Sequence, residues 1–284
     1  MKTLCVVLML VFALPAFASR TLTDETGRVV VVPDHPHRLI CLVPSVVDEV
    51  YSLGGGDDIV GVSDYLKYPK EALKKPSVGS MFQPSLETIV SLHPDLVLAI
   101  KMVDGSVALD KIRALGVPVY VIDPHGFEGI YRSLESIGDV LNRRAEADAE
   151  VARLRARVER VRASVKGKPV FRIFMPIWYD PVITIGRGAF ITEMIAAAGA
   201  RSVTDDVVQE WPQMSIESIV ERAPEALLLV RGGRVSLNVL KDRPGWRSMP
   251  AIQSARVYYV DDRVDLISPV AIDALEEMAK EFHP

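Results

Sequence analysis

Residue types that could carry out chemistry are present, but none of them falls into a catalytic or metal-binding pattern. The five histidines and the two cysteines lack the spacing that metal sites use. The sequence has no Gly-x-Ser-x-Gly nucleophile elbow and no phosphate loop ending in Gly-Lys-Ser/Thr. His125 follows an expected strand and could face a cleft, although a loop histidine is the simpler interpretation. We therefore predict no catalytic residue, no metal site and no cofactor, and a protein that is not an enzyme.

Aromatic residues point instead to the binding of a ligand. Six of them lie near expected strand ends or in the loops beside a repeated helix: Tyr65, Tyr68, Phe82, Trp178, Tyr179 and Trp211. A cleft that receives aromatic side chains from two lobes suits a large, flat and partly apolar ligand. Single aromatic residues more often pack in a core, so both interpretations stay open.

An internal repeat indicates that the chain has two similar halves. The segment Ser85–Val90, followed by Pro94–Leu98, recurs 130 positions later as Ser215–Val220, followed by Pro224–Leu228, without a gap. One repeat at such a long spacing predicts duplicated domains, because solenoid proteins repeat every 20 to 50 residues. Two lobes form a cleft, and ligands of open α/β sheets bind beyond the carboxyl ends of the strands.

Each copy of the repeat carries one glutamate. Ser85 and Ser215 are expected helix N-caps, which places Glu87 and Glu217 in the first helical turn. A carboxylate there complements the helix dipole by about 0.3–1 kcal/mol. Alternatively, the two glutamates form a matched pair of exposed acids, one per lobe, that grips a symmetric basic partner.

The elements that must position these residues alternate between strands and helices. Expected strands cover 39–43, 59–62, 96–100 and 117–122, then 170–175, 182–185, 226–230 and 257–260. Helices are expected between them, including 45–53, 189–198, 215–222 and 272–281, and a β-hairpin at 21–33 precedes them. Apolar strands that alternate with helices predict parallel sheets with both faces covered.

One long amphipathic helix separates the halves. Apolar residues recur at spacings of four and three over 143–166, and Gly167 and Pro169 end the pattern. Its length of roughly 36 Å would reach from one lobe to the other. The predicted fold is α/β: two Rossmann-like lobes with mainly parallel sheets, joined by a single long α-helix, with a ligand cleft between the lobes. The N-terminal lobe is expected at 19–142, the linking helix at 143–167 and the C-terminal lobe at 168–284.

The N-terminus predicts export. Lys2, a short apolar run and the motif Ala16-Phe17-Ala18 are typical of a signal peptide over residues 1–18, and the run is shorter than the roughly 20 residues that span a bilayer. A periplasmic location follows as an expectation. Cys41 would be the single cysteine of the mature chain and is expected to be a buried hydrophobe. The net charge of −4 offers no basic face for nucleic acid.

Several short motifs together carry a family resemblance. They are Asp24-x-x-Gly27-Arg28, Pro36–Ile40, Gly61–Ser63, Leu86-Glu87 with Pro94–Val97, and Gly186-x-Gly188-x-Phe190. Nearly the whole mature chain resembles the periplasmic binding proteins whose lobes are joined by a rigid helix. Those proteins are receptors of ABC importers for vitamin B12, iron–siderophores and haem. The resemblance implies a monomer that binds a small metal chelate and delivers it to permease subunits at the inner membrane.

Within that family, the cobalamin-binding members are the most similar. The segments from Gly61 to Pro69 and from Trp211 to Ser215 carry this likeness. It implies that Ser45, Tyr65 and Trp211 contact the ligand, and that Glu87 and Glu217 dock onto permease arginines. The ligand-binding residues expected in all are Ser45, Tyr65, Tyr68, Phe82, Trp178, Tyr179, Trp211 and Asp262.

The chain also departs from the cobalamin-binding pattern. Met81 and Ile100 stand where two cleft tryptophans would be, and Leu266 stands where an arginine would be, while Asp262 is retained. A corrinoid remains the first expectation for the ligand, and a ferric siderophore is the alternative. Haem ranks below both, because a haem receptor would more often have a tyrosine near Met81. A chelatase-like enzyme on a two-lobed α/β fold is the alternative from another class, but it would need a cluster of Cys or His.

Overall fold

The computed structural model describes residues 18–284, so the predicted signal peptide lies outside the described residues except for Ala18. Two four-stranded parallel sheets form the centres of the two lobes. The first contains β3 (Leu39–Cys41), β4 (Ile59–Val62), β5 (Leu96–Ile100) and β6 (Val119–Ile122). The second contains β7 (Arg172–Phe174), β10 (Arg201–Ser202), β12 (Ala226–Val230) and β13 (Val257–Val260).

The two sheets share one topology. Their orders are β4-β3-β5-β6 and β10-β7-β12-β13, so in each lobe the first strand of the sheet lies between the second and the third. The same order in both lobes agrees with the duplication that the sequence repeat predicts. The predicted α/β class with two lobes is confirmed.

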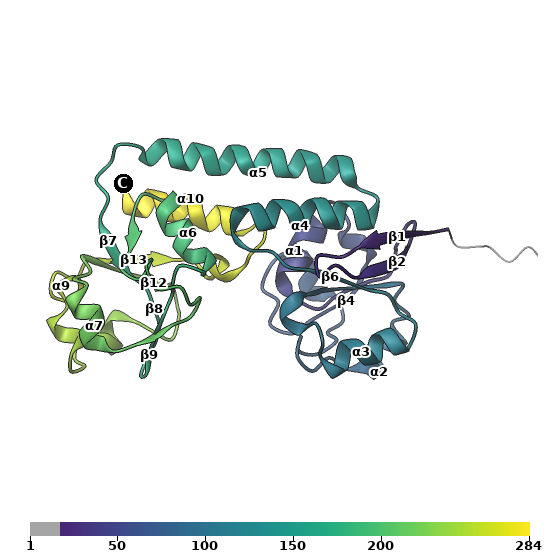
Figure 1. Ribbon diagram of the computed structural model, residues 1–284, viewed down its shortest axis with the longest axis horizontal. Coiled ribbons are helices and arrows are strands. Elements are labelled where there is room, and N and C mark those ends of the chain that lie inside the picture. The colour runs from purple at the N-terminus through teal and green to yellow at the C-terminus, as the bar shows by residue number, and fades with distance from the viewer. Residues whose placement is uncertain (1–17) are drawn as a thin grey trace, which may run out of the picture.

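The helices lie around these sheets (Figure 1). The first lobe has α1 (Pro44–Ser52), α2 (Leu86–Ser91), α3 (Val107–Ala114) and α4 (Gly126–Leu141), with short 3-10 helices at Gly56–Asp58, Lys70–Lys74 and Lys101–Val103. The second lobe has α6 (Phe190–Ala197), α7 (Ile216–Glu221), α8 (Leu237–Leu240), α9 (Pro250–Gln253) and α10 (Ala271–Phe282), with 3-10 helices at Trp246–Ser248 and Asp262–Asp265. Both serines of the repeat are N-caps, as predicted: the hydroxyls of Ser85 and Ser215 accept from the backbone N–H of Thr88 and Ser218.

Helix α5 (Arg144–Val165) runs unbroken along both lobes, as Figure 1 shows. Its buried stripe contains Leu154, which is fully buried in a hydrophobic cluster shared by the two lobes. Neighbouring arginines attach it on both sides. Arg155 makes two hydrogen bonds of 2.7 Å to Glu128 of α4, and Arg157 reaches Asp273 and Glu276 of α10 at 2.6 and 2.8 Å.

The lobes also cap each other's helices. A carboxylate oxygen of Glu193, on α6, accepts from the backbone N–H of Phe127 in the first turn of α4 at 3.1 Å. In return, Asp48 on α1 accepts from the backbone N–H of Val270, just before α10, at 2.9 Å. Because carboxylates are favourable at helix N-termini, these reciprocal contacts stabilise one arrangement of the lobes.

The second lobe also contains a small antiparallel sheet that the sequence pattern did not predict. It consists of β8 (Pro176–Tyr179), β9 (Val182–Thr184) and β11 (Gln213–Met214), in the order β11-β9-β8. The expected strand at 182–185 therefore pairs outside the parallel sheet. Asp180 and Pro181 form a connection of two residues between β8 and β9, which is short enough for a hairpin.

Other local expectations hold. The hairpin forms as β1 (Ser19–Thr23) and β2 (Val29–Pro33). Cys41 is fully buried in β3, and burial raises the pKa of its thiol. Over residues 18–284, no helix has the length and apolar character needed to cross a membrane.

Candidate ligand-binding cleft

A cavity of about 540 Å³ lies between the lobes. The first lobe lines it with Val43, Pro44, Ser45, Met81, Ile100, Lys101, Met102, Asp123, Pro124 and His125, and the second with Phe190, Ile191, Glu210, Trp211, Val264, Asp265, Leu266 and Ile267. Most first-lobe residues come directly after β3, β5 and β6 or at their ends, so the cavity lies at the carboxyl ends of the strands. Its volume and largely apolar lining are typical of a small-molecule site.

Backbone pairing positions Trp211 on the second-lobe wall. The N–H of Gly186 donates to the carbonyl of Glu210 at 2.9 Å, and the N–H of Thr184 donates to the carbonyl of Pro212 at 3.1 Å. A Cβ at position 186 would lie 1.9 Å from the carbonyl oxygen of Gln209, so this close approach requires glycine. The loop is thus held against β9, and the Trp211 side chain remains 47% exposed.

The first-lobe wall combines one hydroxyl with apolar side chains. Ser45 is half-buried near the N-terminus of α1, directly after β3. Met81, Ile100 and Met102 supply apolar surface, and Met102 is exposed. Methionine adapts its shape to an apolar partner, so this wall suits a bulky ligand even though it lacks the two tryptophans of the cobalamin-binding pattern.

Charged groups lie at the edges of this apolar surface. On the first-lobe side, Lys101 Nζ is 2.7 Å from Asp123 Oδ2, and His125 Nε2 is 3.0 Å from Asp123 Oδ1. The second lobe adds Glu210 and Asp265. Asp265 is solvent-exposed at the open cleft, but the protein atoms around it partly desolvate its carboxylate. This desolvation, together with the negative charge of nearby Asp262, raises the pKa of Asp265 to about 6.

Asp262 connects the lobes beside the cavity. Its carboxylate forms an ion pair with Lys67 and accepts from the hydroxyl of Tyr68 at 3.3 Å. Tyr65, in the same first-lobe loop, has a left-handed backbone with φ of 66° and a side chain that is 87% exposed. Neither tyrosine nor Asp262 is among the residues that line the cavity.

The remaining predicted aromatics also lie outside the cavity lining. Trp178 stacks on Tyr179 in β8 with ring centroids 5.1 Å apart, and the guanidinium of Arg243 lies 4.4 Å from the Tyr179 ring. Phe82 is exposed, next to the cavity residue Met81. The structure thus brings Ser45 and Trp211 together in one cavity. The other six predicted residues lie outside the lining, and ligand contact by all eight stays a prediction.

The two glutamates of the repeat occupy matching positions. Glu87 on α2 and Glu217 on α7 are both exposed, and neither forms an ion pair within the described part of the chain. Figure 1 places α2 and α7 in different lobes, on the side of the molecule away from α5. A partner that meets this side could contact both.

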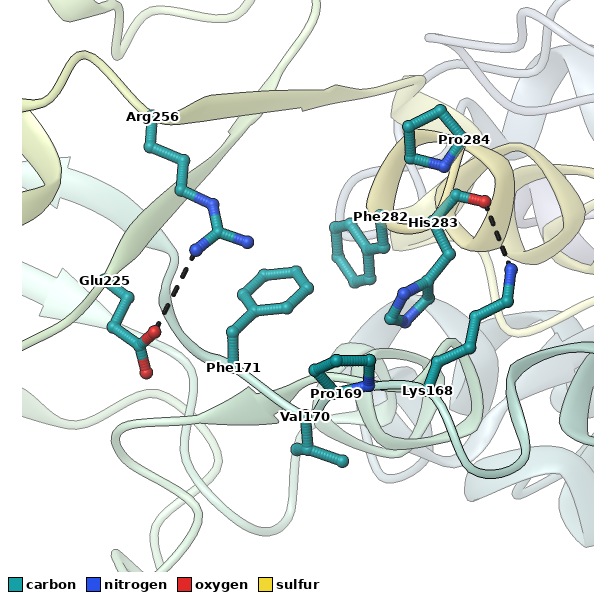
Figure 2. A pocket seen from close by; sticks show the side chains of 9 residues that line it. All are labelled: Lys168, Pro169, Val170, Phe171, Glu225, Arg256, Phe282, His283 and Pro284. Carbon is teal, nitrogen blue, oxygen red and sulfur yellow. Dashed lines mark hydrogen bonds and ion pairs between the residues drawn. The ribbon is translucent and has the colours of Figure 1, made fainter.

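A second hollow, of about 440 Å³, lies on the second lobe alone (Figure 2). Its cations are already engaged: Arg256 lies over the ring of Phe171 and 3.9 Å from Glu225, and Lys168 donates to the carbonyl of His283. Across residues 18–284, no group of three or more His, Cys, Asp or Glu side chains could hold a metal ion. The interlobe cavity is therefore the candidate site.

Sequence reasoning missed most of the cavity. Met102, Val264 and Ile267 are apolar residues that no pattern distinguishes from core residues. Met81, Ile100 and Leu266 do line the cavity, at the positions where the resemblance places cleft residues. Glu210 and Asp265 carry a weaker signal, because each lies close in the sequence to a selected residue, Trp211 and Asp262. His125 does face the cleft, the less favoured of its two interpretations.

Comparisons with known proteins agree with this arrangement. The profile described as "Periplasmic binding protein" matches residues 39–264. The ABC transporter substrate-binding lipoprotein YvrC of Bacillus subtilis (strain 168) is 31% identical over 274 residues, covering 93% of this chain and 85% of that protein. The vitamin B12-binding protein of Vibrio parahaemolyticus serotype O3:K6 (strain RIMD 2210633) is 25% identical over 271 residues, covering 94% and 93%.

One solved structure extends the comparison. It is described as a possible iron-binding (periplasmic solute-binding) protein from Staphylococcus epidermidis ATCC 12228. It superposes with a TM-score of 0.79 and 30% sequence identity, over 88% of this chain and 100% of that one. With a profile match across both lobes and relatives that span nearly its whole length, the chain belongs to the periplasmic binding protein family.

Proposed function

We propose that this protein is the periplasmic receptor of an ABC importer, and that it binds a corrinoid in the interlobe cleft and delivers it to the permease. The observation that carries the proposal is the cavity of about 540 Å³, with exposed Trp211 on one wall and apolar side chains from both lobes. A large, flat chelate with an apolar face would bury this surface. The vitamin B12-binding relative, which matches over nearly its whole length, supports the corrinoid.

A ferric siderophore is the second candidate. The likeness to a possible iron-binding protein favours it, and so does the absence of two cleft tryptophans at Met81 and Ile100. Haem would use the same apolar walls. The family consists of binding proteins, which weighs against the chelatase-like enzyme.

Visible absorbance separates the three ligands. The mature protein is mixed with cyanocobalamin, haem or a ferric trihydroxamate, and free ligand is removed by gel filtration. The proposal predicts that the corrinoid bands remain with the protein at one ligand per chain. Retention of haem or the ferric chelate, with no corrinoid retained, would contradict the proposal that the ligand is a corrinoid. The proposed receptor function would still stand.

Delivery to the permease rests on the glutamate pair. Glu87 and Glu217 are exposed on equivalent helices, and both helices lie on the side of the molecule away from α5, so we expect each glutamate to meet a basic residue of one of two like permease subunits. Exposed charges at the edge of an interface mainly change association rate and salt dependence. Neither residue lines the cleft, so ligand affinity should not depend on them.

The double variant Glu87→Ala, Glu217→Ala tests delivery. We expect ligand binding close to wild type and a sharp fall in receptor-stimulated ATP hydrolysis by the reconstituted importer. The variant Glu146→Ala, Glu159→Ala removes two exposed acids from α5 and serves as the control. Full stimulation by the Glu87/Glu217 variant would mean that these acids only complement helix dipoles.

A further inference from the structure

The charges along the interlobe cleft are unequal. The lining contains one cation, Lys101, and three carboxylates, those of Asp123, Glu210 and Asp265. Its net charge is therefore −2 when His125 is neutral. A ligand that enters the cleft therefore meets a surplus of negative charge close to its rim.

The only lysine of the lining is already paired. Lys101 Nζ lies 2.7 Å from one oxygen of Asp123, and His125 Nε2 lies 3.0 Å from the other. Lys67, beside the cavity, is paired in the same way with Asp262. An anionic ligand would have to break one of these ion pairs to gain a counter-charge, so neither lysine is free to bind an anion.

The carboxylates of the second-lobe wall are unpaired. Neither Glu210 nor Asp265 makes a side-chain hydrogen bond or ion pair with another residue between 18 and 284. Both side chains are exposed to the cleft. Desolvation and the charge of Asp262 raise the pKa of Asp265, and Lys67 opposes this shift. A raised pKa means that the ionised carboxylate is poorly stabilised, so a hydrogen bond donated by a ligand would stabilise it.

We infer that the cleft selects metal chelates of neutral or positive charge whose rim donates N–H groups, and rejects chelates whose rim carries carboxylates. Glu210 and Asp265 are the specificity-determining residues. The inference rests on the proposed receptor function and narrows its ligand class. An amidated corrinoid presents primary amides that can donate to both acids, whereas the corresponding polyacid presents like charges. Such like-charge contacts across an interface are strongly unfavourable.

A pair of corrinoids with the same metal and ring isolates this effect. Calorimetric titration at low salt compares cobinamide, whose side chains are amides, with cobyrinic acid, whose side chains are carboxylates. We expect cobinamide to bind at least about tenfold more tightly, and the ratio to shrink as salt screens the charges. The double variant Glu210→Gln, Asp265→Asn should also reduce the ratio. The control Glu146→Gln, Asp242→Asn removes two exposed acids outside the cleft and should leave the ratio unchanged.

The outcomes separate this inference from the proposed function. Equal affinity of the wild type for both corrinoids, or an unchanged ratio in the Glu210/Asp265 variant, would overturn the charge selection and leave corrinoid binding in place. Binding of neither corrinoid would contradict the proposal that the ligand is a corrinoid. In that case the same variants are titrated with haem and with a ferric trihydroxamate that carries an ammonium group. A preference of the wild type for haem would overturn the inference as well.

Discussion

At the scale of single residues, the most unusual group outside the cleft is Glu49 on α1. Its side chain is fully buried, and burial, with a smaller effect of nearby Asp48 and Glu25, raises its pKa well above the ordinary value. It contacts the hydroxyl of Ser133, which also lies 3.1 Å from the carbonyl of Ile130. A hydroxyl has one hydrogen, so both contacts are satisfied when protonated Glu49 donates to Ser133 and Ser133 donates to Ile130.

This protonation predicts a pH dependence of stability. The unfolded chain releases the Glu49 proton near pH 4.5, whereas the folded chain keeps it to higher pH. The folded state then binds more protons, so the free energy of unfolding falls as pH rises above 4.5, until the folded-state pKa is reached. Glu49→Gln is neutral and should lose this slope, while the exposed-site variant Glu146→Gln should keep it. Denaturant unfolding between pH 4 and 9 measures the slopes, and parallel curves for wild type and Glu49→Gln would contradict the prediction.

Single residues also show where sequence reasoning ends. Ser45 and Trp211 could be placed in the cleft because the family resemblance includes them, and the cavity does contain them. Residue type selects Trp178 and Tyr179, but they lie in the small antiparallel sheet outside the cavity lining, where they stack on each other and Arg243 lies over the Tyr179 ring. Their contact with a ligand stays a prediction. Residue type alone does not report the pairing of short strands, which depends on distant partners.

At the scale of elements, the local signals were sufficient for most of the fold. The strands β4, β5, β12 and β13 have the bounds that their apolar runs predict, and both serine caps begin their helices. The continuous α5 follows from its long apolar repeat and the glycine after it. The reciprocal caps by Asp48 and Glu193 could not be foreseen, because they join helices of different lobes.

Because α5 packs against both lobes, we predict that the two lobes unfold cooperatively, in a single transition. Leu154 is fully buried in the cluster that contains residues of both lobes. Leu154→Ala should therefore cost about 2–5 kcal/mol of unfolding free energy, because it removes buried contacts and leaves a cavity. Thermal or denaturant unfolding should remain a single transition at a lower midpoint. The exposed α5 variant Arg160→Ala should change stability by no more than about 0.5 kcal/mol. Two separate transitions would mean that the lobes unfold independently.

At the scale of the whole molecule, the linking helix limits how far the lobes can move. Arg155 and Arg157 attach α5 to α4 and α10, and the helix contains no break between Arg144 and Val165. Hinge motion in other proteins uses a few residues that absorb large backbone changes, and a continuous helix provides none. We therefore expect ligand binding to close the cleft by only a few degrees.

Small-angle scattering tests this rigidity. The radius of gyration should be nearly equal with and without saturating ligand, and insertion of two glycines after Arg155 should increase the difference. A strong compaction of the wild type on adding ligand would show that the lobes move about another connection.

The central claim is that the interlobe cleft binds the ligand, and calorimetric titration with cyanocobalamin tests it most directly. We predict one site per chain, a negative heat-capacity change from apolar burial, and affinity about tenfold or more weaker for Trp211→Ala, since stacking adds to the burial of the ring. Tyr259→Ala, at an exposed aromatic outside the cavity lining, should bind like the wild type. Unchanged affinity of Trp211→Ala for a ligand that the wild type binds one to one would contradict the account, because the site would then lie elsewhere.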